Sequence, residues 1–295
     1  MGSFLGHVVP GTFFSLFSLW WLLSIFRRYY MCKRAAGEGG GGGGRIFYRN
    51  TSTFFTPCCP KLPFEGMLKV VAVVIGMTGE FATAWKNGVF VHLNNAQHMT
   101  MFFFFGLNGA MDILGHYGAP LPKDLDYVSA ILAFLIEGFL FLYHLHGRTP
   151  MDVQVHMYLV YVVAGCVIAT GLEMYHRRSV LPALARVYFT LLQGTWFFQV
   201  GFILYPPVGQ KWTEDDHSQM MIVTLIFCWH CAVVFVLMLV AGFLIHTRVK
   251  ALSSATVYHS LHPLTRLSSA NGSCLSKMDT EQVRHIIADS EEEDV

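Results

Sequence analysis

Residues 219–246 read QMMIVTLIFCWHCAVVFVLMLVAGFLIH, a stretch that contains no Asp, Glu, Lys or Arg. About 20 helical residues suffice to cross the hydrocarbon core of a bilayer, and this stretch exceeds that length. A soluble domain has no use for so long an apolar segment. The stretch therefore predicts an integral membrane protein whose partner is the lipid bilayer.

Six more apolar stretches of similar length precede it. We place them near residues 8–28, 66–85, 98–116, 126–145, 153–175 and 183–204. Together the seven stretches predict an all-α fold, a seven-helix transmembrane bundle that forms one domain over residues 1–252. The polar remainder, residues 253–295, is expected to be a disordered cytosolic tail.

Composition supports this class of protein. Hydrophobic residues make up 54% of the 295 residues and charged residues only 13%, against about 25% charged residues in soluble domains. The formal net charge is +1, which predicts no nucleic-acid partner. The seven cysteines are scattered and odd in number, so they do not form a disulfide framework.

The distribution of basic residues predicts the orientation, because cytosolic loops of membrane proteins are enriched in Lys and Arg. The connection after the first span, the alternating connections on the same side and the tail together hold 17 of the 20 Lys and Arg residues. The other side holds only Lys86, Arg148 and Lys211. The N-terminus is therefore expected outside the cytosol and the C-terminus inside it.

The first cytosolic connection, residues 29–65, contains an uninterrupted glycine run at 39–44. Glycine runs have no capacity to form a core, so we expect a flexible linker. Cys58 and Cys59 lie just before the second span, a juxtamembrane position that suits S-acylation as well as two unmodified thiols.

The tail carries features of a regulated or partner-binding segment. Ser290 precedes a continuous acidic run, a setting read by acidophilic kinases, and the terminal residues suit a pocket that captures C-terminal carboxylates. Two glycosylation sequons begin at Asn50 and Asn271. The predicted orientation places both in the cytosol, so neither is expected to carry a glycan.

Ionisable residues inside the spans are the candidate functional residues, because each costs about 2.5–3.5 kcal/mol at the centre of a bilayer. Six of them fall between mid-membrane and the outer surface, and we expect them to face one shared cavity: Glu80, His98, Glu137, His144, His156 and His230. A secondary polar set comprises Asp112, His116 and Glu173 near the cytosolic ends and Gln193 and Gln199 on the sixth span.

Several roles are open for the six residues. In the first, they pair across helices as structural links. In the second, they form a pathway for protons or metal ions, or bind a metal such as zinc, because carboxylates and imidazoles are zinc ligands. A metal-dependent membrane hydrolase would use the same ligands, although no HExxH or serine-elbow motif is present. Haem ligation by a pair of histidines is a fourth role.

Several sequence blocks resemble the transmembrane protein 45 family (domain of unknown function 716). They are GHVVPGTFF at 6–14, QHMTM at 97–101, EGFLF at 137–141 with His144 and His146, LQGTWFFQ at 192–199, LYPP at 204–207 and CWH at 228–230. The resemblance runs in order from residue 2 to about 250, and the block from 193 to 207 is the most specific. The longer first connection and Cys231 depart from the family pattern.

The resemblance implies a multi-pass protein of endomembranes (Golgi or endosome) and the plasma membrane, in a family with no established enzymatic activity. It also places His98, Glu137, His144 and His230 at motif positions. We therefore expect a non-catalytic membrane scaffold or interaction protein, with protein partners bound through the tail. The alternatives are a transporter coupled to protons or metal ions and, less directly supported, the metal-dependent membrane hydrolase.

Overall fold

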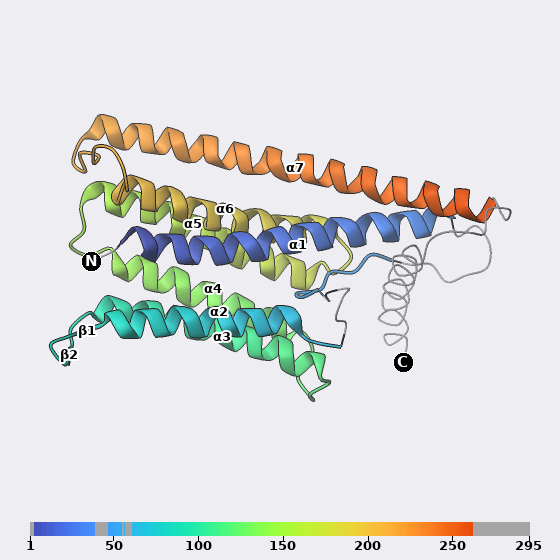
Figure 1. Cartoon of the computed structure of the whole chain (residues 1–295), viewed down its shortest axis with the longest axis horizontal. Coiled ribbons are helices and arrows are strands. Elements are labelled where there is room, and N and C mark those ends of the chain that lie inside the picture. The colour runs from blue at the N-terminus through green and yellow to red at the C-terminus, as the bar shows by residue number, and fades with distance from the viewer. Residues whose placement is uncertain (1–2, 39–46, 55, 57–60, 262–295) are drawn as a thin grey trace.

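The computed structural model describes residues 3–38, 47–54, 56 and 61–261. Within them the chain forms helices and one small hairpin (Figure 1). The elements are α1 (Phe4–Glu38), α2 (Phe64–Thr83), β1 (Trp85–Lys86), β2 (Val89–Phe90), α3 (Leu93–His116), α4 (Leu125–His144), α5 (Pro150–Tyr175), α6 (Val180–Leu204) and α7 (His217–Leu261).

The helices make this an integral membrane protein in contact with the lipid bilayer. Among the described residues, α1, α2, α4, α5, α6 and α7 are each long and apolar enough to cross a membrane. Helix α3 does not reach that level of hydropathy. Polar residues such as Asn94, Asn95, Gln97 and Asn108 interrupt its apolar sequence. The helical fold is thus confirmed, and six spans are supported by length and composition.

Helices α2 to α6 agree with the predicted stretches to within a few residues at each end, whereas α1 and α7 are longer than predicted. Residues 29–38, expected in a flexible loop, continue α1, and residues 253–261, expected in the disordered tail, continue α7. Both extensions are almost free of helix breakers, and Pro263 follows the end of α7 in the sequence.

The helices form a bundle in which consecutive helices run in opposite directions (Figure 1). Helix α1 packs against α6 and α7, each helix from α2 to α6 packs against the next one, and α5 also contacts α7. The main apolar core surrounds Trp196 on α6, which is fully buried. Small residues allow the closest approach: a Cβ placed on Gly194 would lie 2.6 Å from the backbone nitrogen of Ser15 on α1.

The strands β1 and β2 form a hairpin between α2 and α3, a feature that the prediction of an all-α fold did not include. Asn87 and Gly88 connect the strands with positive φ angles of 52° and 77°. Such a turn suits Asn-Gly because its two central residues adopt left-handed conformations.

Part of the first connection is also ordered against the bundle. The side chain of Asn50 donates to the carbonyl oxygens of Ser179 and His176, at 2.7 and 3.1 Å. The backbone N–H of Asn50 donates to the carbonyl of Arg177 at 2.7 Å. This stretch therefore differs from the expected flexible loop, while the glycine run lies outside the described residues.

Candidate functional site: two buried polar clusters

Ionisable side chains from five helices and one loop gather at the end of the bundle that holds the N-terminus. We call this group the histidine cluster: His7 (α1), Glu80 (α2), His98 (α3), His144 (α4), Arg148 (the α4–α5 loop), Asp152 and His156 (both α5). Four of the six residues predicted to share a cavity, Glu80, His98, His144 and His156, belong to it.

One edge of the histidine cluster joins α2 to α3 and α4. His98 Nδ1 lies 3.0 Å from Glu80 Oε1. The side chains of His98 and Glu80 retain 32% and 20% of their exposure, so this pair lies at the rim of the bundle. The rings of His98 and His144 are 5.3 Å apart between centroids, which links the pair to α4.

Arg148 lies at the centre of the histidine cluster. Its guanidinium donates from Nη1 to both carboxylate oxygens of Asp152, at 2.9 and 3.1 Å, and from Nη2 to Nε2 of His144. A guanidinium only donates, so His144 Nε2 must accept and Nδ1 carries the ring proton. That assignment agrees with the contact of 2.8 Å between His144 Nδ1 and Gln97 Oε1.

The other edge of the cluster joins α5 to α1. His156 Nδ1 lies 2.8 Å from the Asp152 carboxylate and 2.8 Å from the Asp152 carbonyl. The His156 ring meets the His7 ring edge to face, with centroids 5.7 Å apart. Tyr205, just after α6, packs 5.5 Å from His7, and burial together with the Asp152 carboxylate raises the pKa of its hydroxyl.

The donor chemistry of the histidine cluster does not suit a zinc ion. A ligating imidazole needs a free nitrogen lone pair, and Arg148 already uses that of His144 Nε2. The guanidinium also places a permanent positive charge beside His144 and Asp152, which disfavours a bound cation there. Over the described ranges 3–38, 47–54, 56 and 61–261, no group of three or more His, Cys, Asp or Glu side chains is arranged to hold a metal.

Glu137 lies apart from the histidine cluster. It is buried on α4, and its Oε1 accepts a hydrogen bond of 2.8 Å from Gln193 Nε2 on α6. Its Oε2 has no partner among the described residues. Glu137 and His144 are two helical turns apart, or about 10 Å along α4.

His230 is also separate. Its Nε2 lies 2.9 Å from Thr195 Oγ1, and its ring meets the edge of Trp196 at 5.5 Å. Thr195 is two residues from Gln193, the partner of Glu137, and residues two apart on a helix point about 160° away from each other. The structure therefore places Glu137 and His230 on different sides of α6, and it differs here from the expected single cavity.

A second group lies in the other half of the bundle, and we call it the ion-pair cluster. It comprises Glu65 and Lys69 on α2, Asp112 on α3, Glu173 on α5 and Arg186 on α6. Lys69 Nζ lies 2.6 Å from Asp112 Oδ2 and 3.4 Å from Glu65 Oε1, and it donates to Asn108 at 3.1 Å.

Arg186 and Glu173 form the deepest pair of the ion-pair cluster. Arg186 donates to Glu173 at 2.5 and 3.3 Å, and the hydroxyl of Tyr127 donates to the same carboxylate at 3.0 Å. Trp21 joins the two halves of this cluster, because its indole N–H donates to Glu65 at 2.7 Å while the Arg186 guanidinium lies 4.3 Å from its ring centroid.

The residues of the secondary polar set lie in different parts of the bundle. Asp112 and Glu173 belong to the ion-pair cluster, and Gln193 holds Glu137. His116 Nε2 lies 3.1 Å from the carbonyl of Lys61. Gln199 is half-buried on α6 and makes no hydrogen bond to the six residues among those described. Cys58, Cys59 and Ser290 lie outside the described residues.

Sequence reasoning missed the basic partners. Lys69, Arg148 and Arg186 serve above only as markers of orientation, although each forms an ion pair that is at least partly buried. A signal was present in two cases, because Glu65 and Lys69, and likewise Arg148 and Asp152, are four residues apart. Opposite charges at that spacing meet on one face of a helix.

Comparisons with known proteins agree with this picture of a membrane protein. Residues 123–243 match the family of unknown function DUF716. Human transmembrane epididymal protein 1 is 31% identical over 182 residues, which is 58% of this chain and 66% of that protein. Mouse transmembrane epididymal protein 1A is 26% identical over 241 residues, 78% of this chain and 76% of the mouse protein. The family resemblance is confirmed: residues 123–243 match DUF716, and the chain is a homologue of the transmembrane epididymal proteins.

Proposed function

We propose that this protein is a non-catalytic membrane scaffold that crosses the bilayer seven times and binds protein partners on its cytosolic side. Its buried ionisable residues tie the helices to one another. The observation that carries the proposal is the projection of α1 and α7 beyond the other helices at one end of the bundle (Figure 1). That projection offers a surface for partners which the bilayer does not cover.

Helix α3 would serve as the seventh span. Its polar residues Asn108 and Asp112 are buried and paired with neighbours on α2 and α4. Its exposed large side chains are apolar, among them Phe103, Leu107 and Leu114. A helix that turns polar groups inward and apolar groups outward suits a lipid environment even when its mean hydropathy is moderate.

The length of α7 supports the projection. Its 45 residues span roughly 68 Å, more than twice the roughly 30 Å of a hydrocarbon core. Tyr30 on α1 packs 4.9 Å from His246 on α7, and Phe26 lies against Gly242, so the two helices stay together at that end. Arg248 and Lys250 follow on α7, which suits a cytosolic location.

The pairing of the ionisable residues favours a structural role over a chemical one. Each carboxylate of the ion-pair cluster meets a cation or an N–H donor, and the lone pair of His144 is used by Arg148. Interhelical polar contacts of this kind stabilise membrane bundles. A catalytic or metal-binding group would keep a free lone pair directed at its substrate.

Charge reversal on the projection tests the proposal. Partners captured by proximity labelling in intact cells are compared between the full chain, a variant with Arg248→Glu and Lys250→Glu, and a control with Lys211→Glu in the loop before α7. The proposal expects a defined set of proteins to disappear only in the first variant. An identical set in all three would contradict it.

A transporter coupled to protons is the second candidate, and one observation favours it. Polar atoms connect Glu137 through Gln193 and Cys166 to Thr190, with contacts of 2.8, 3.6 and 3.8 Å. Thr190 donates a hydrogen bond to the backbone carbonyl of Arg186, so the chain of polar contacts that starts at Glu137 ends at a residue of the ion-pair cluster. The roughly 10 Å between Glu137 and His144 is instead lined by apolar residues such as Phe141, which weighs against a continuous proton path.

The site of action would be the endomembrane system (Golgi or endosome), the plasma membrane, or both. This part of the proposal rests on the family resemblance alone. The hydrolase alternative gains no support from the described donor groups.

A further inference from the structure

An aromatic-lined cavity lies inside the bundle, and residues of all six helices from α1 to α6 line it. It encloses about 860 Å³ that no protein atom fills, including the part open to the surroundings. Six phenylalanines and one tryptophan line it: Phe13, Phe14, Phe17, Trp21, Phe102, Phe105 and Phe134. Cavities that are mostly apolar with a few polar groups are typical of small-molecule sites.

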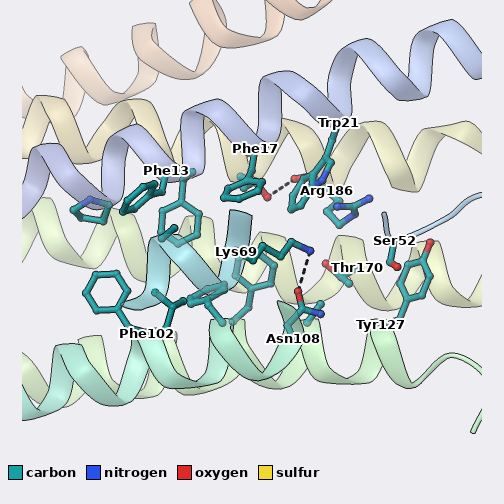
Figure 2. A pocket seen from close by; sticks show the side chains of 18 residues that line it. Phe13, Phe17, Trp21, Ser52, Lys69, Phe102, Asn108, Tyr127, Thr170 and Arg186 are labelled. Atoms are coloured by element: carbon teal, nitrogen blue, oxygen red, sulfur yellow. Dashed lines mark hydrogen bonds between the residues drawn. The ribbon is translucent and has the colours of Figure 1, made fainter. Parts of the chain in front are cut away.

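The cavity has an apolar end and a polar end. Figure 2 shows Phe13 and Phe102 at one end and Arg186, Thr170 and Tyr127 toward the other. Helices α1 and α2 both line it and are joined by hydrogen bonds from Trp20 and Trp21 to Glu65, but they lack the extended packing that joins α1 to α6 and α2 to α3. A ligand dissolved in the bilayer could therefore enter between α1 and α2.

The walls of the cavity are preformed. Phe14 meets Phe105 edge to face at 5.4 Å, Phe105 meets Phe134 at 5.5 Å, and Phe14 stacks on Phe197 at 6.0 Å. A site whose side chains already hold one another loses little conformational entropy on binding. It also favours a rigid ligand, which has little entropy of its own to lose.

The charges around the polar end exclude a charged head group. The lining residues include Lys69 and Arg186 but no carboxylate, so a cationic head would meet two cations first. Behind them stand Glu65, Asp112 and Glu173, three carboxylates for two cations, so an added anion would increase an existing excess of negative charge. A neutral head group avoids both penalties.

The polar end can form hydrogen bonds with a hydroxyl. Arg186 donates to Glu173 from Nε and Nη2, and its Nη1 has no hydrogen-bond partner among the described residues. The hydroxyls of Thr170 and Thr190 donate to backbone carbonyls, which leaves lone pairs on both oxygens to accept a hydrogen bond. A ligand hydroxyl could accept from Arg186 and donate to a threonine.

We propose that this cavity binds a neutral, rigid lipid of the sterol class, with its hydroxyl at Arg186 and its ring system among the phenylalanines. The ligand would enter from the bilayer between α1 and α2. This site is independent of the cytosolic projection and of the scaffold role proposed above.

Photolabelling of the full-length protein in detergent or nanodiscs tests the proposal. A photoactivatable sterol is cross-linked to the protein and competed with four lipids: cholesterol, cholesterol 3-sulfate, 5-cholestene without the hydroxyl, and monoolein. The expected result is competition by cholesterol at least tenfold stronger than by any of the other three. Equal competition by cholesterol 3-sulfate would contradict the requirement for a neutral head group. Equal competition by 5-cholestene would contradict the hydrogen bond to the hydroxyl, and equal competition by monoolein would contradict the preference for a rigid ligand.

A variant that fills the cavity gives a second readout. Ala130 on α4 lines the cavity and touches neither ion pair, so Ala130→Phe should reduce labelling at least tenfold. Leu135→Phe, on the exposed face of the same helix, is the matched control and should label normally. If Ala130→Phe lowers the unfolding temperature sharply, Ala130→Leu replaces it. Unchanged labelling in a folded cavity variant would overturn the proposal.

Discussion

Arg148 donates a hydrogen bond to Nε2 of His144, and this contact lies at the centre of the histidine cluster. Arg148 also pairs with Asp152, which in turn contacts His156. A permanently charged guanidinium thus lies between the side chains that would otherwise be available to a metal. The cluster is accordingly a link among α4, α5 and their loop, with α1, α2 and α3 joined through ring contacts and the Glu80–His98 pair.

Replacing Arg148 should loosen this end of the bundle. In Arg148→Met, Asp152 loses its ion pair and His144 loses its donor, so we expect a loss of about 1–3 kcal/mol of unfolding free energy. Thermal unfolding in detergent measures it, with Lys211→Met in the exposed loop as the control. Adding Asp152→Asn should cost less than the sum of the two single changes. Additive losses would show that the two side chains are not coupled.

The Glu173–Arg186 pair should matter more, because both side chains are almost fully buried, with 0% and 4% exposure. Glu173→Gln leaves Arg186 as an uncompensated buried charge, and we expect a loss of about 3–5 kcal/mol. The double variant Glu173→Leu, Arg186→Met should be closer to the parent in stability than Glu173→Gln is. A stable Glu173→Gln protein would mean that the pair contributes little to folding.

Close packing of α1 on α6 should be sensitive to a single added side chain. Gly194→Val places Cβ where Ser15 already lies, and we expect a loss of about 1–3 kcal/mol or more. Gly171→Val on α5 is the matched control, because nothing lies within 4 Å of a Cβ there. Equal melting temperatures for the two variants would be at odds with the observed α1–α6 contact.

The orientation of the chain can be tested by glycosylation. Asn50 is 1% exposed and its amide is hydrogen-bonded, so glycosidase treatment should not change the mobility of the parent protein. Val89→Thr creates a sequon at Asn87 in the exposed β1–β2 hairpin, and this variant should gain a glycan. A glycan at Asn50, or none at Asn87 in a folded variant, would speak against an extracytosolic N-terminus.

Sequence reasoning located the helices well because apolar length decides them. The boundaries of α2 to α6 follow from runs that end at polar or Pro-containing connections. The predicted ends of α1 and α7 were wrong, because both helices continue into polar sequence that contains few helix breakers. Hydropathy does not indicate where a helix ends in polar sequence. The β1–β2 hairpin does have a sequence signal, the Asn87-Gly88 pair, which favours a tight turn between two strands.

The polar site could be predicted only in part. Depth in the membrane placed Glu80, His98, His144 and His156 in one half of the bundle, and these four side chains belong to the histidine cluster. The depth of a residue in the membrane does not indicate which way its side chain points around the bundle. The separation of Glu137 from His230 by α6 therefore could not be predicted. The choice of partners, such as Gln193 for Glu137, depends on how helices rotate against one another, and one sequence does not contain that information.

Ion flux tests the central claim, that the buried ionisable residues are structural, most directly. Purified full-length protein is reconstituted into vesicles, and proton and zinc flux are recorded beside protein-free vesicles and the Glu137→Gln variant. Glu137 is the decisive residue because its Oε2 is buried without a partner among the described residues. Our account predicts flux no greater than in protein-free vesicles for both proteins. A flux in the parent that Glu137→Gln abolishes would contradict it and establish the transporter.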